Sequence, residues 1–488
     1  MAYRDLREFI ERLEAAGELR RIGAEVDPEL EVAEIANRVV KAGGPALLFE
    51  NVRGHTVPVL TNHYGSHKRM AWALGVADVE EIRLRIEGLV KQRPPAGLGD
   101  KVRAGLELLR LASFAPKTVG SAPCQEVVQD PPDLGHFPAL KTWPRDGGRF
   151  ITLPMVFTRH PETGQRNVGM YRLHIYDERS TGMHWHPHKV GAMHYRIYEK
   201  LGRHMPVAVA LGGDPAMTYA ATAPLPEDID EVMFAGFLRQ QAVELVKCQT
   251  CDLEVPADAE VVLEGHVEPG ERRVEGPFGD HTGYYSPAEE YPVFHVERIT
   301  HRRDPIWPAT VVGPPPMEDC YMGKATERIF LPLLQMVFPE VVDVNLPIVG
   351  VFHNLALVSI RKGFPGHARK VMQGLWGTGQ MMFTKVIVVV DEDVNVQDGR
   401  EVLWKALNSI DPKRDVMFVE GPVDALDHAA PQPLMGSKMG VDATRKWPEE
   451  GYEREWPEEL KMDEAVRQRI SDLWNELGLP GEVNAACA

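Results

Sequence analysis

The chain has 488 residues, 44% of them apolar and 26% charged, which is typical of a globular protein with a large core and about three domains. Its 54 basic and 71 acidic residues give a net charge of −17, and no basic tract interrupts this, which argues against a nucleic-acid partner. The five cysteines, the lack of a signal-peptide core and the lack of any apolar run near the roughly 20 residues of a membrane helix predict a cytoplasmic protein without transmembrane segments.

Residues 1–115 are predicted to form an N-terminal α/β domain. Apolar residues at helical spacing indicate a first helix that Gly17 ends. Asp27 and Pro28 are typical of the N-cap and first turn of a second helix. The expected elements are helices over 5–16 and from 27 onward, strands at 46–49 and 57–60, and a helical stretch around 102–111.

Residues 116–315 change in character, since short β-like runs alternate with loops rich in glycine and proline. This pattern predicts a barrel-like β domain whose irregular loops carry function. One helical insertion is expected over 228–238. The expected strands are 149–158, 169–176, 207–211, 260–267 and 293–300.

Residues 316–446 read as a βαβαβ domain, with strands at 355–360, 386–390 and 416–419 and helices at 366–376 and 398–409. Residues 447–488 are a linker followed by an amphipathic C-terminal helix. Such a helix on a long tether needs an apolar groove, which its own chain or a neighbouring subunit could supply. Its apolar stripe consists of Val466, Ile470, Leu473, Trp474 and Leu477.

The segment 275–285 (Glu-Gly-Pro-Phe-Gly-Asp-His-Thr-Gly-Tyr-Tyr) sets two carboxylates, Glu275 and Asp280, in a turn too rich in glycine and proline for a helix or regular strand. Arg172 lies about a hundred residues upstream. A buried arginine beside two acids can hold one ionised while the other keeps its proton, as acid–base chemistry requires. The alternative is a surface loop with ordinary solvated acids.

Histidines gather at 174, 184, 186, 188 and 194, five of the chain's 18. Such imidazoles can bind a metal, stack on an aromatic ligand or donate to a phosphate, or they are simply packed in a loop. Asn167, His188 and Glu231 together would make a mixed O/N donor set suited to Mn²⁺ or Mg²⁺. Spacing alone does not join Glu231 to the others, because it lies among acids typical of a solvated helix start.

Three other sequence patterns are weaker evidence for a functional site. Cys248 and Cys251 form a lone CxxC, which supports neither a zinc knuckle nor a thioredoxin-like site. A solvated strand end explains the acids at 391–393. The segment 436–440 (Gly-Ser-Lys-Met-Gly) could lay Lys438 and backbone amides near a phosphate. The sequence has no GxGxxG, GxxxxGK[ST] or GxSxG motif.

Several long motifs in fixed order resemble the UbiD family of reversible aromatic and α,β-unsaturated acid decarboxylases, nearly end to end. They lie at 167–172, 247–257, 264–265, 275–285 and 436–444. The resemblance implies a flavin-binding split barrel in the middle of the chain and an α/β oligomerisation domain after it. It also implies a homodimer or hexamer in which the last helix reaches a partner subunit.

The resemblance further implies prenylated FMN held by Mn²⁺ (or Mg²⁺) and K⁺, with a flavin prenyltransferase as supplier of the cofactor. Loss of CO₂ from an sp² carbon needs such an electron sink. By motif, Arg172, Glu275 and Asp280 match the catalytic network, with Asp280 as proton donor, and Asn167, His188 and Glu231 match the metal ligands. The cofactor-binding residues would be Met170, Tyr171, Arg172, His184, Trp185, His186, Lys189, Val190 and Lys438.

The substrate is expected to be a small aromatic acid. The histidine-rich segment 184–189 departs from the version associated with polyprenyl-hydroxybenzoate enzymes, which favours a phenolic or polycyclic acid as much as a polyprenylated one. Two alternatives are an FMN- or metal-dependent oxidoreductase on the same barrel and a non-catalytic flavin-binding subunit. A non-catalytic subunit would be expected to lack at least one of Arg172, Glu275 and Asp280.

Overall fold

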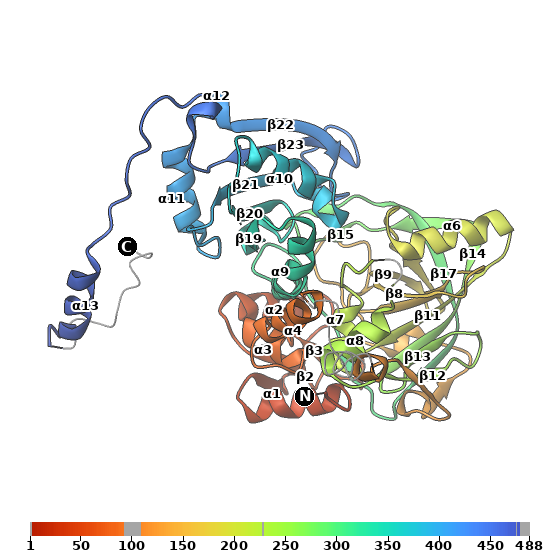
Figure 1. Cartoon of the computed structure of the whole chain (residues 1–488). Coiled ribbons are helices and arrows are strands. Elements are labelled where there is room, and N and C mark those ends of the chain that lie inside the picture. The colour runs from red at the N-terminus through yellow and green to blue at the C-terminus, as the bar shows by residue number, and fades with distance from the viewer. Residues whose placement is uncertain (1, 92–108, 227–228, 475, 479–488) are drawn as a thin grey trace. The chain divides into compact units, whose positions relative to one another are not determined.

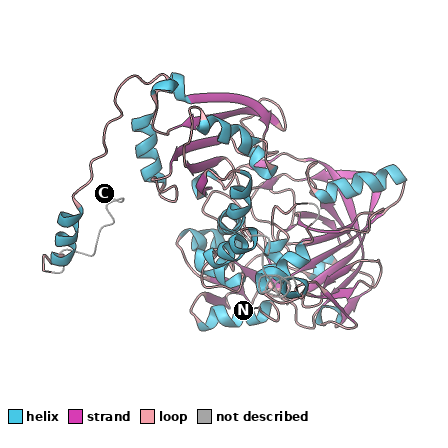
Figure 2. Ribbon diagram, in the orientation of Figure 1, coloured by secondary structure: helices cyan, strands magenta, loops and turns pink. Residues whose placement is uncertain are grey.

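The computed structural model describes residues 2–91, 109–226, 229–474 and 476–478. Its contacts divide the chain into two compact units, Met1–Pro332 (unit 1) and Leu333–Ala488 (unit 2). Both units mix helices and sheets (Figures 1 and 2), which confirms the mixed α/β class. Most of the helical stretch predicted around 102–111 lies outside the described residues.

The N-terminal part of unit 1 contains a four-stranded sheet with the order β1-β2-β3-β18. β1 and β2 are parallel, β2 and β3 are antiparallel, and β18 adds in parallel to β3 although it comes from the far end of unit 1. The bounds are α1 (Leu6–Ala15), β1 (Leu19–Ile22), α2 (Glu31–Lys41), β2 (Ala46–Phe49), β3 (Val59–Thr61), α3 (His67–Ala73), α4 (Glu80–Val90) and β18 (Trp307–Pro308).

The second helix begins later than the sequence predicts. Asp27 is not its N-cap, since α2 starts at Glu31, and the Asp27 carboxylate instead accepts from the amide of Glu29 at 2.8 Å. Leu30 has a φ of 72°, and its amide donates to the carbonyl of Lys141 at 2.9 Å. This hydrogen bond to a distant segment turns the chain just before the helix, which local propensity cannot reveal.

The middle of the sequence of unit 1 forms a nine-stranded, curled half-barrel sheet (Figure 2), and all its neighbouring strands are antiparallel. The order is β6-β9-β10-β17-β14-β11-β7-β8, with β5 paired to β17. Its strands cover the five runs that the sequence predicts between 149 and 300, but two of these runs are divided. The run 149–158 forms β6 and β7, and the run 169–176 spans the end of β8 and most of β9. The bounds are β5 (Val127–Gln129), β6 (Phe150–Ile151), β7 (Met155–Arg159), β8 (Arg166–Met170), β9 (Leu173–Asp177), β10 (Ser180–Met183), β11 (Met205–Leu211), β14 (Val261–Glu275) and β17 (Glu289–His301).

The remaining elements of unit 1 include a three-stranded sheet with the order β13-β12-β4. The predicted helical insertion is α8, which begins at Glu231; residues 227–228 lie outside the described chain. α9 continues across the boundary into unit 2. The bounds are β4 (Lys117–Val119), α6 (Val190–Leu201), α7 (Pro215–Ala220), α8 (Glu231–Arg239), β12 (Glu244–Lys247), β13 (Glu254–Pro256) and α9 (Glu318–Val337).

The segment with the two acids is more regular than predicted. Glu275 is the last residue of β14, and β15 (Phe278–Gly279) pairs with β16 (Tyr285–Ser286) in a short antiparallel hairpin. Gly276 and Gly283 have φ values of 87° and 82°, a region that glycine enters without strain. The glycines therefore supply turns on either side of short strands rather than preventing strands altogether.

Unit 2 has a five-stranded mixed sheet with the order β19-β20-β21-β23-β22. β20 and β21 are parallel as predicted, but the strand predicted at 416–419, β22, is antiparallel to β23 and does not touch β21. The bounds are β19 (Val341–Asn345), β20 (Leu355–Ile360), α10 (His367–Trp376), β21 (Val386–Asp391), α11 (Gly399–Ser409), α12 (Pro412–Asp415), β22 (Val416–Pro422) and β23 (Met435–Asp442).

The segment 436–440, predicted to lay Lys438 and backbone amides near a phosphate, lies in β23, which pairs with β21. Gly440 marks a close approach of two elements, because a Cβ there would lie 2.5 Å from Sδ of Met372 on α10. The terminal helix α13 (Glu464–Leu473) is present, with Val466 and Ile470 each 41% exposed. Among the described helices, none combines the length and apolarity needed to cross a bilayer.

Candidate active site

Three strand ends of unit 1 bring Arg172, Glu275 and Asp280 together. Arg172 lies between β8 and β9, Glu275 ends β14, and Asp280 follows β15. The amide of Gly276 donates to Nδ1 of His174 at 3.3 Å, which ties the end of β14 to β9. Arg172 and Glu275, more than a hundred positions apart, thus meet at strand ends of the nine-stranded sheet, and the β15–β16 hairpin adds Asp280.

Arg172 is the centre of the network. Its Nε donates to Glu275 Oε1 at 2.8 Å and its Nη2 to Glu275 Oε2 at 3.2 Å, while its Nη1 donates to Asp280 Oδ2. Nη2 also donates to Ser286 Oγ at 3.1 Å, and the guanidinium carbon lies 4.5 Å from the ring centroid of Phe278. The side chains of the three charged residues are at most 9% exposed, so water screens these ion pairs little.

Both acids ionise readily. Burial opposes ionisation of Glu275, but its contact with His184 and the charge of Arg172 outweigh burial and lower its pKa to about 2. Burial opposes ionisation of Asp280 too, while the charge of Arg172 and hydrogen bonds from His281 hold its pKa well below the usual value. The prediction that one acid keeps its proton is therefore wrong for the free chain, because one guanidinium serves both.

His281 and Asp319 complete the surroundings of Asp280, and sequence reasoning missed both. The backbone N and the Nδ1 of His281 lie 2.8 and 2.9 Å from Asp280 Oδ1. Burial raises the pKa of Asp319, at the start of α9, to about 6, and the charges of His281 and Asp280 act on it. Its Oδ1 is shielded from solvent without a hydrogen-bond partner among the described residues. A carboxyl that holds a proton in weakly acid solution thus lies beside Asp280.

A chain of imidazoles leads away from Glu275. Glu275 Oε2 lies 3.1 Å from His184 Nδ1, and His184 Nε2 lies 2.8 Å from His186 Nε2. Two ring nitrogens at this distance share one proton, since one must donate and the other accept. Burial and the charge of Arg172 lower the pKa of His184. The chain connects the fully buried Glu275 with the half-buried His186.

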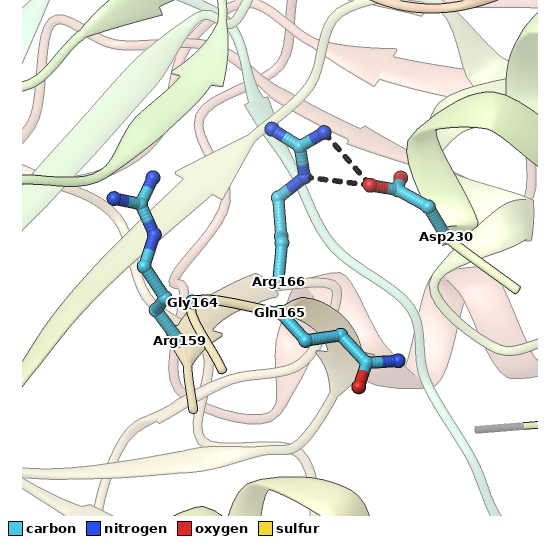
Figure 3. Close-up of a pocket in the computed structure, with 5 residues that line it drawn as sticks. All are labelled: Arg159, Gly164, Gln165, Arg166 and Asp230. Atoms are coloured by element: carbon cyan, nitrogen blue, oxygen red, sulfur yellow. Dashed lines mark hydrogen bonds and ion pairs between the residues drawn. The ribbon is translucent and has the colours of Figure 1, made fainter. Parts of the chain in front are cut away.

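Asn167 and Glu231, two of the predicted metal ligands, are neighbours, because the amide of Val168 donates to Glu231 Oε2 at 3.0 Å. Beside them, Arg166 donates twice to Asp230, at 3.1 and 2.8 Å, in a cavity of about 360 Å³ (Figure 3). Since Arg166 precedes Asn167 and Asp230 precedes Glu231, this ion pair holds the two predicted ligands near each other. The cavity is also lined by Arg159, Gly164 and Gln165.

The third predicted ligand, His188, lies on the loop after His186, and its exposed ring is 5.7 Å from the ring of His186. Asn167 is only 4% exposed, and burial raises the pKa of Glu231 to about 7. A buried carboxyl with so high a pKa gains from a cation beside it. The donor set of one carboxylate, one amide and one imidazole suits Mn²⁺ or Mg²⁺.

The predicted cofactor-binding residues of unit 1 lie close together around the start of α6. Trp185 is 5% exposed, and its Nε1 has no hydrogen-bond partner among the described residues. Its ring centroid lies 6.3 Å from that of Tyr171, which follows Met170 at the end of β8. Lys189 is the N-cap of α6 and Val190 its first residue. An orphaned buried donor beside a helix N-terminus fits an anionic, polar ligand.

Lys438, the remaining predicted cofactor-binding residue, belongs to unit 2. It lies on β23 and is 2% exposed, and its Nζ donates to the carbonyl of Met382. Burial lowers its pKa. Its assignment to the cofactor therefore stays a prediction.

Comparison with protein families gives three matches in order along the chain. They are described as the N-terminal, Rift-related and C-terminal domains of 3-octaprenyl-4-hydroxybenzoate carboxy-lyase, over residues 10–87, 117–315 and 320–443. An uncharacterised protein of Archaeoglobus fulgidus is 55% identical over 479 residues, 98% of this chain and 99% of that protein. One from Aquifex aeolicus is 50% identical over 481 residues, with coverage of 98% and 99%.

Solved structures agree with these matches. Vanillic acid decarboxylase of Sedimentibacter hydroxybenzoicus, in its closed form, has a TM-score of 0.87 and 31% identity over 98% of this chain and 99% of its own. An evolved dimeric form of the UbiD-class enzyme HmfF of Pelotomaculum thermopropionicum, in complex with prenylated FMN, has a TM-score of 0.77 and 30% identity over 96% and 100%. A 3,4-dihydroxybenzoic acid decarboxylase of Klebsiella pneumoniae, at 24% identity and a TM-score of 0.76, shares the fold.

Proposed function

The chain belongs to the UbiD family and is a carboxy-lyase, and from this premise we propose that it decarboxylates an aromatic or α,β-unsaturated acid reversibly and without oxidation, using prenylated FMN. The observation that carries the proposal is the buried bridge from Arg172 to both Glu275 and Asp280. A non-catalytic subunit has no need to keep two ionised acids out of water around one arginine, because burying them costs free energy.

The residues of unit 1 fit the cofactor and its ion. Trp185 offers an unpaired buried N–H, and Lys189 with the first turn of α6 offers positive charge to a phosphate. Asn167, His188 and Glu231 would hold Mn²⁺ or Mg²⁺, and K⁺ is part of the same proposal. When bound, prenylated FMN supplies the electron sink that loss of CO₂ from an sp² carbon requires.

Asp280 is the proposed proton donor, and its neighbours decide when it carries a proton. In the free chain Arg172 keeps it ionised. A substrate carboxylate bound against Arg172 takes a share of that positive charge and adds a negative one, and both effects raise the pKa of Asp280. Burial raises the pKa of Asp319 to about 6, and its charge interacts with that of His281, whose Nδ1 lies 2.9 Å from Asp280 Oδ1. His281 can thus pass a proton to Asp280.

Glu275 has a different role. Its two-point pair with Arg172 fixes the guanidinium, so that the remaining Nη1 faces Asp280. Its contact with His184 continues to His186, which gives the buried pair a path for protons to the half-buried end of the loop. Glu275 thereby sets the charge around the donor without giving up a proton itself.

The loop that carries these histidines supports the proposed substrate class. His184 and His186 lie in the segment whose sequence departs from that associated with polyprenyl-hydroxybenzoate enzymes. The ring centroid of Tyr291 lies 4.4 Å from that of His184. Polar imidazoles beside a tyrosine suit a small phenolic or polycyclic acid better than a long isoprenoid chain. The similarity to a vanillic acid decarboxylase supports a phenolic acid.

Assembly and supply of the cofactor are part of the proposal. A flavin prenyltransferase would provide prenylated FMN, and the enzyme would work in the cytoplasm as a homodimer or hexamer. Val466 and Ile470 of α13 are exposed, as expected of a helix that packs on a partner subunit. We also retain the division into 1–115, a prenyl-FMN-binding split barrel at 116–315, an oligomerisation domain at 316–446, and a linker with terminal helix at 447–488.

The test is co-expression with a flavin prenyltransferase, followed by the absorbance spectrum of the purified protein and by CO₂ and H–D exchange on a panel of aromatic acids. The proposal expects a spectrum that differs from that of FMN and exchange on at least one phenolic acid. Unmodified FMN with no exchange on any acid would instead favour an FMN-dependent oxidoreductase or a flavin-binding subunit.

A further inference from the structure

A second candidate site lies at the tip of the β12–β13 hairpin, outside the network around Arg172. β12 and β13 are antiparallel, with Lys247 opposite Glu254, and the amide of Cys248 donates to the carbonyl of Leu253 at 2.9 Å to close the loop. Cys248 and Cys251 both lie in this loop, and both are partly buried and free. A CxxC pair in a tight hairpin loop is the arrangement with which zinc knuckles present two thiolates.

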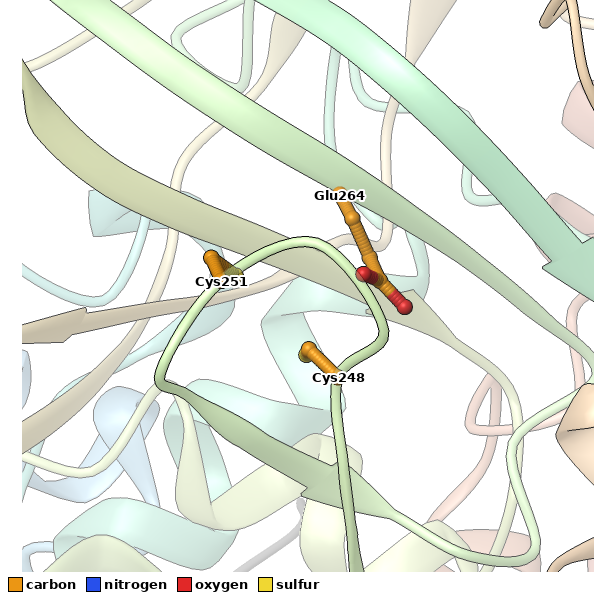
Figure 4. A group of neighbouring side chains, drawn as sticks. All are labelled: Cys248, Cys251 and Glu264. Atoms are coloured by element: carbon orange, nitrogen blue, oxygen red, sulfur yellow. The ribbon is translucent and has the colours of Figure 1, made fainter.

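A third ligand comes from a different sheet. Glu264 on β14 points at the loop, and one of its carboxylate oxygens and the two Sγ atoms all lie within 4.8 Å of one another (Figure 4). The sequence offers no hint of this, because Glu264 is brought to the cysteines by the antiparallel register of β14 with β11 and β17. The lone CxxC therefore has the third ligand that sequence reasoning could not supply.

The two oxygens of Glu264 have unequal surroundings. Oε2 accepts from the amides of Gln249 and Thr250, each at 2.7 Å, and from the Thr250 hydroxyl at 2.9 Å. Oε1 has no hydrogen-bond partner among the described residues, although the Glu264 side chain is fully buried. A buried, unpaired carboxylate oxygen is costly. Three donors thus fix the carboxylate while its other oxygen is left for a ligand.

We infer that Cys248 Sγ, Cys251 Sγ and Glu264 Oε1 form a binding site for a thiolate-preferring divalent metal, with Zn²⁺ as the ion of choice. Two thiolates and one carboxylate satisfy three positions of a tetrahedral ion, and water can take the fourth. Soft sulfur ligands separate this site from the O/N set proposed for Mn²⁺ or Mg²⁺. The donors on Oε2 are the outer partners that orient a metal-binding carboxylate.

The expected role is structural. β12 and β13 belong to the three-stranded sheet and β14 to the nine-stranded sheet, so a metal on these ligands cross-links two sheets that are separate in strand pairing. Binding to the folded chain alone stabilises it in proportion to the logarithm of the free metal concentration. Zinc should therefore raise the melting temperature of the full-length protein, independently of flavin loading.

The test uses Co²⁺ as a spectroscopic probe on the reduced, metal-free, full-length protein. The site predicts one Co²⁺ per chain with thiolate-to-cobalt charge-transfer absorption, displaced by Zn²⁺. It also predicts that Zn²⁺ protects two of the five cysteines from a thiol reagent. Cys248→Ser, Cys251→Ser and Glu264→Gln should each weaken binding at least 10-fold, with the charge-transfer band lost or reduced in the cysteine variants.

Two variants serve as controls. Cys320→Ser removes a free cysteine elsewhere in unit 1, and Glu231→Gln removes a ligand of the proposed Mn²⁺ site; both should keep the cobalt–thiolate band. Wild-type protein that gives no such band, or no protection of thiols by Zn²⁺, overturns the site even if a variant fails to fold. Unchanged Zn²⁺ affinity in folded Glu264→Gln removes Glu264 from it.

Discussion

Arg172 holds Glu275 by two parallel hydrogen bonds, Nε to Oε1 at 2.8 Å and Nη2 to Oε2 at 3.2 Å, and has only Nη1 left for Asp280. The asymmetry means that Glu275 fixes the plane of the guanidinium, while Asp280 has a single hydrogen bond to Arg172. A single contact is easier for a substrate carboxylate to disturb than a two-point pair. The geometry therefore suits Glu275 to stay ionised and paired with Arg172, and it suits Asp280 to gain and lose a proton.

Arg172→Lys should lower kcat/KM about 100-fold or more, because an ammonium cannot make the two parallel bonds and leaves the acids misplaced. The measurement is decarboxylation or H–D exchange with flavin content determined in the same sample. Arg273→Lys is the matched control, since Arg273 lies two residues before Glu275 on β14 but is 53% exposed, and its ion pair with Asp177 is 3.5 Å long. Equal activity of Arg172→Lys and wild type would contradict a bidentate role.

Asp280→Asn should retain bound cofactor and lose turnover by roughly 10²–10⁴-fold, the usual contribution of a positioned general acid. The amide keeps the shape of the side chain but has no carboxyl proton to deliver. Flavin absorbance reports binding, and exchange on the best substrate reports chemistry. Glu290→Gln, at an exposed position of β17, should behave as wild type. A fully active Asp280→Asn enzyme would end the assignment of Asp280 as proton donor.

The sequence predicts the strands of the central sheet and the three residues of the network, but not how charge is shared among them. Arg172, Glu275 and Asp280 lie in recognisable motifs, whereas no motif points to Asp319 at the start of α9, whose charge interacts with that of Asp280. The protonation of the two acids likewise depends on burial and on one shared guanidinium, which are properties of the folded chain. Motif matching finds such residues but gives no pKa.

Two other differences between the sequence-based predictions and the structure also arise from contacts that only the folded chain makes. The segment 436–440 suggests a phosphate-binding segment in the sequence, yet it lies in β23, where Gly440 is needed because Met372 lies where a Cβ would be. Cys248 and Cys251 look incomplete, because Glu264 joins them only through the pairing of β14 with its neighbours. Local sequence patterns predict helices and strands well. The role of a particular glycine or cysteine depends instead on contacts with segments that are distant in the chain.

Gly279→Ala should destabilise the protein by about 1–3 kcal/mol, the typical cost of overpacking, and reduce activity. A Cβ at Gly279 would lie 2.2 Å from Cδ1 of Trp143, whose ring is held by a hydrogen bond from Nε1 to the carbonyl of Val312 at 2.8 Å. The hairpin would have to move, and Asp280 is the next residue. Urea denaturation and exchange activity measure the two effects.

The control for this substitution is Gly88→Ala in α4, where nothing lies within 4 Å of the added Cβ. Alanine is favoured over glycine in a helix by about 1 kcal/mol, so this variant should be as stable as wild type or more so. Gly279→Ala with unchanged stability and activity would show that Trp143 does not fix the position of Asp280.

The low folded-state pKa of Glu275 should make stability depend on pH in acid solution. Its pKa falls from 4.5 to about 2 on folding, so folding favours the ionised form. This stabilisation is fully present above pH 4.5 and is lost as pH falls toward 2, and a shift of this size corresponds to roughly 3 kcal/mol. Asp280 acts in the same direction.

Other acids also titrate in this range, so the informative quantity is the difference in the free energy of unfolding between wild type and Glu275→Gln. We expect this difference to be largest near pH 6 and to shrink steadily between pH 4.5 and 3, measured by urea denaturation of the metal-free protein. Glu289→Gln is the control, because Glu289 lies opposite Glu275 in the β14–β17 register but is exposed. A wild-type advantage over Glu275→Gln that stays constant from pH 6 to pH 3 would mean that Glu275 is not held ionised by Arg172 and His184.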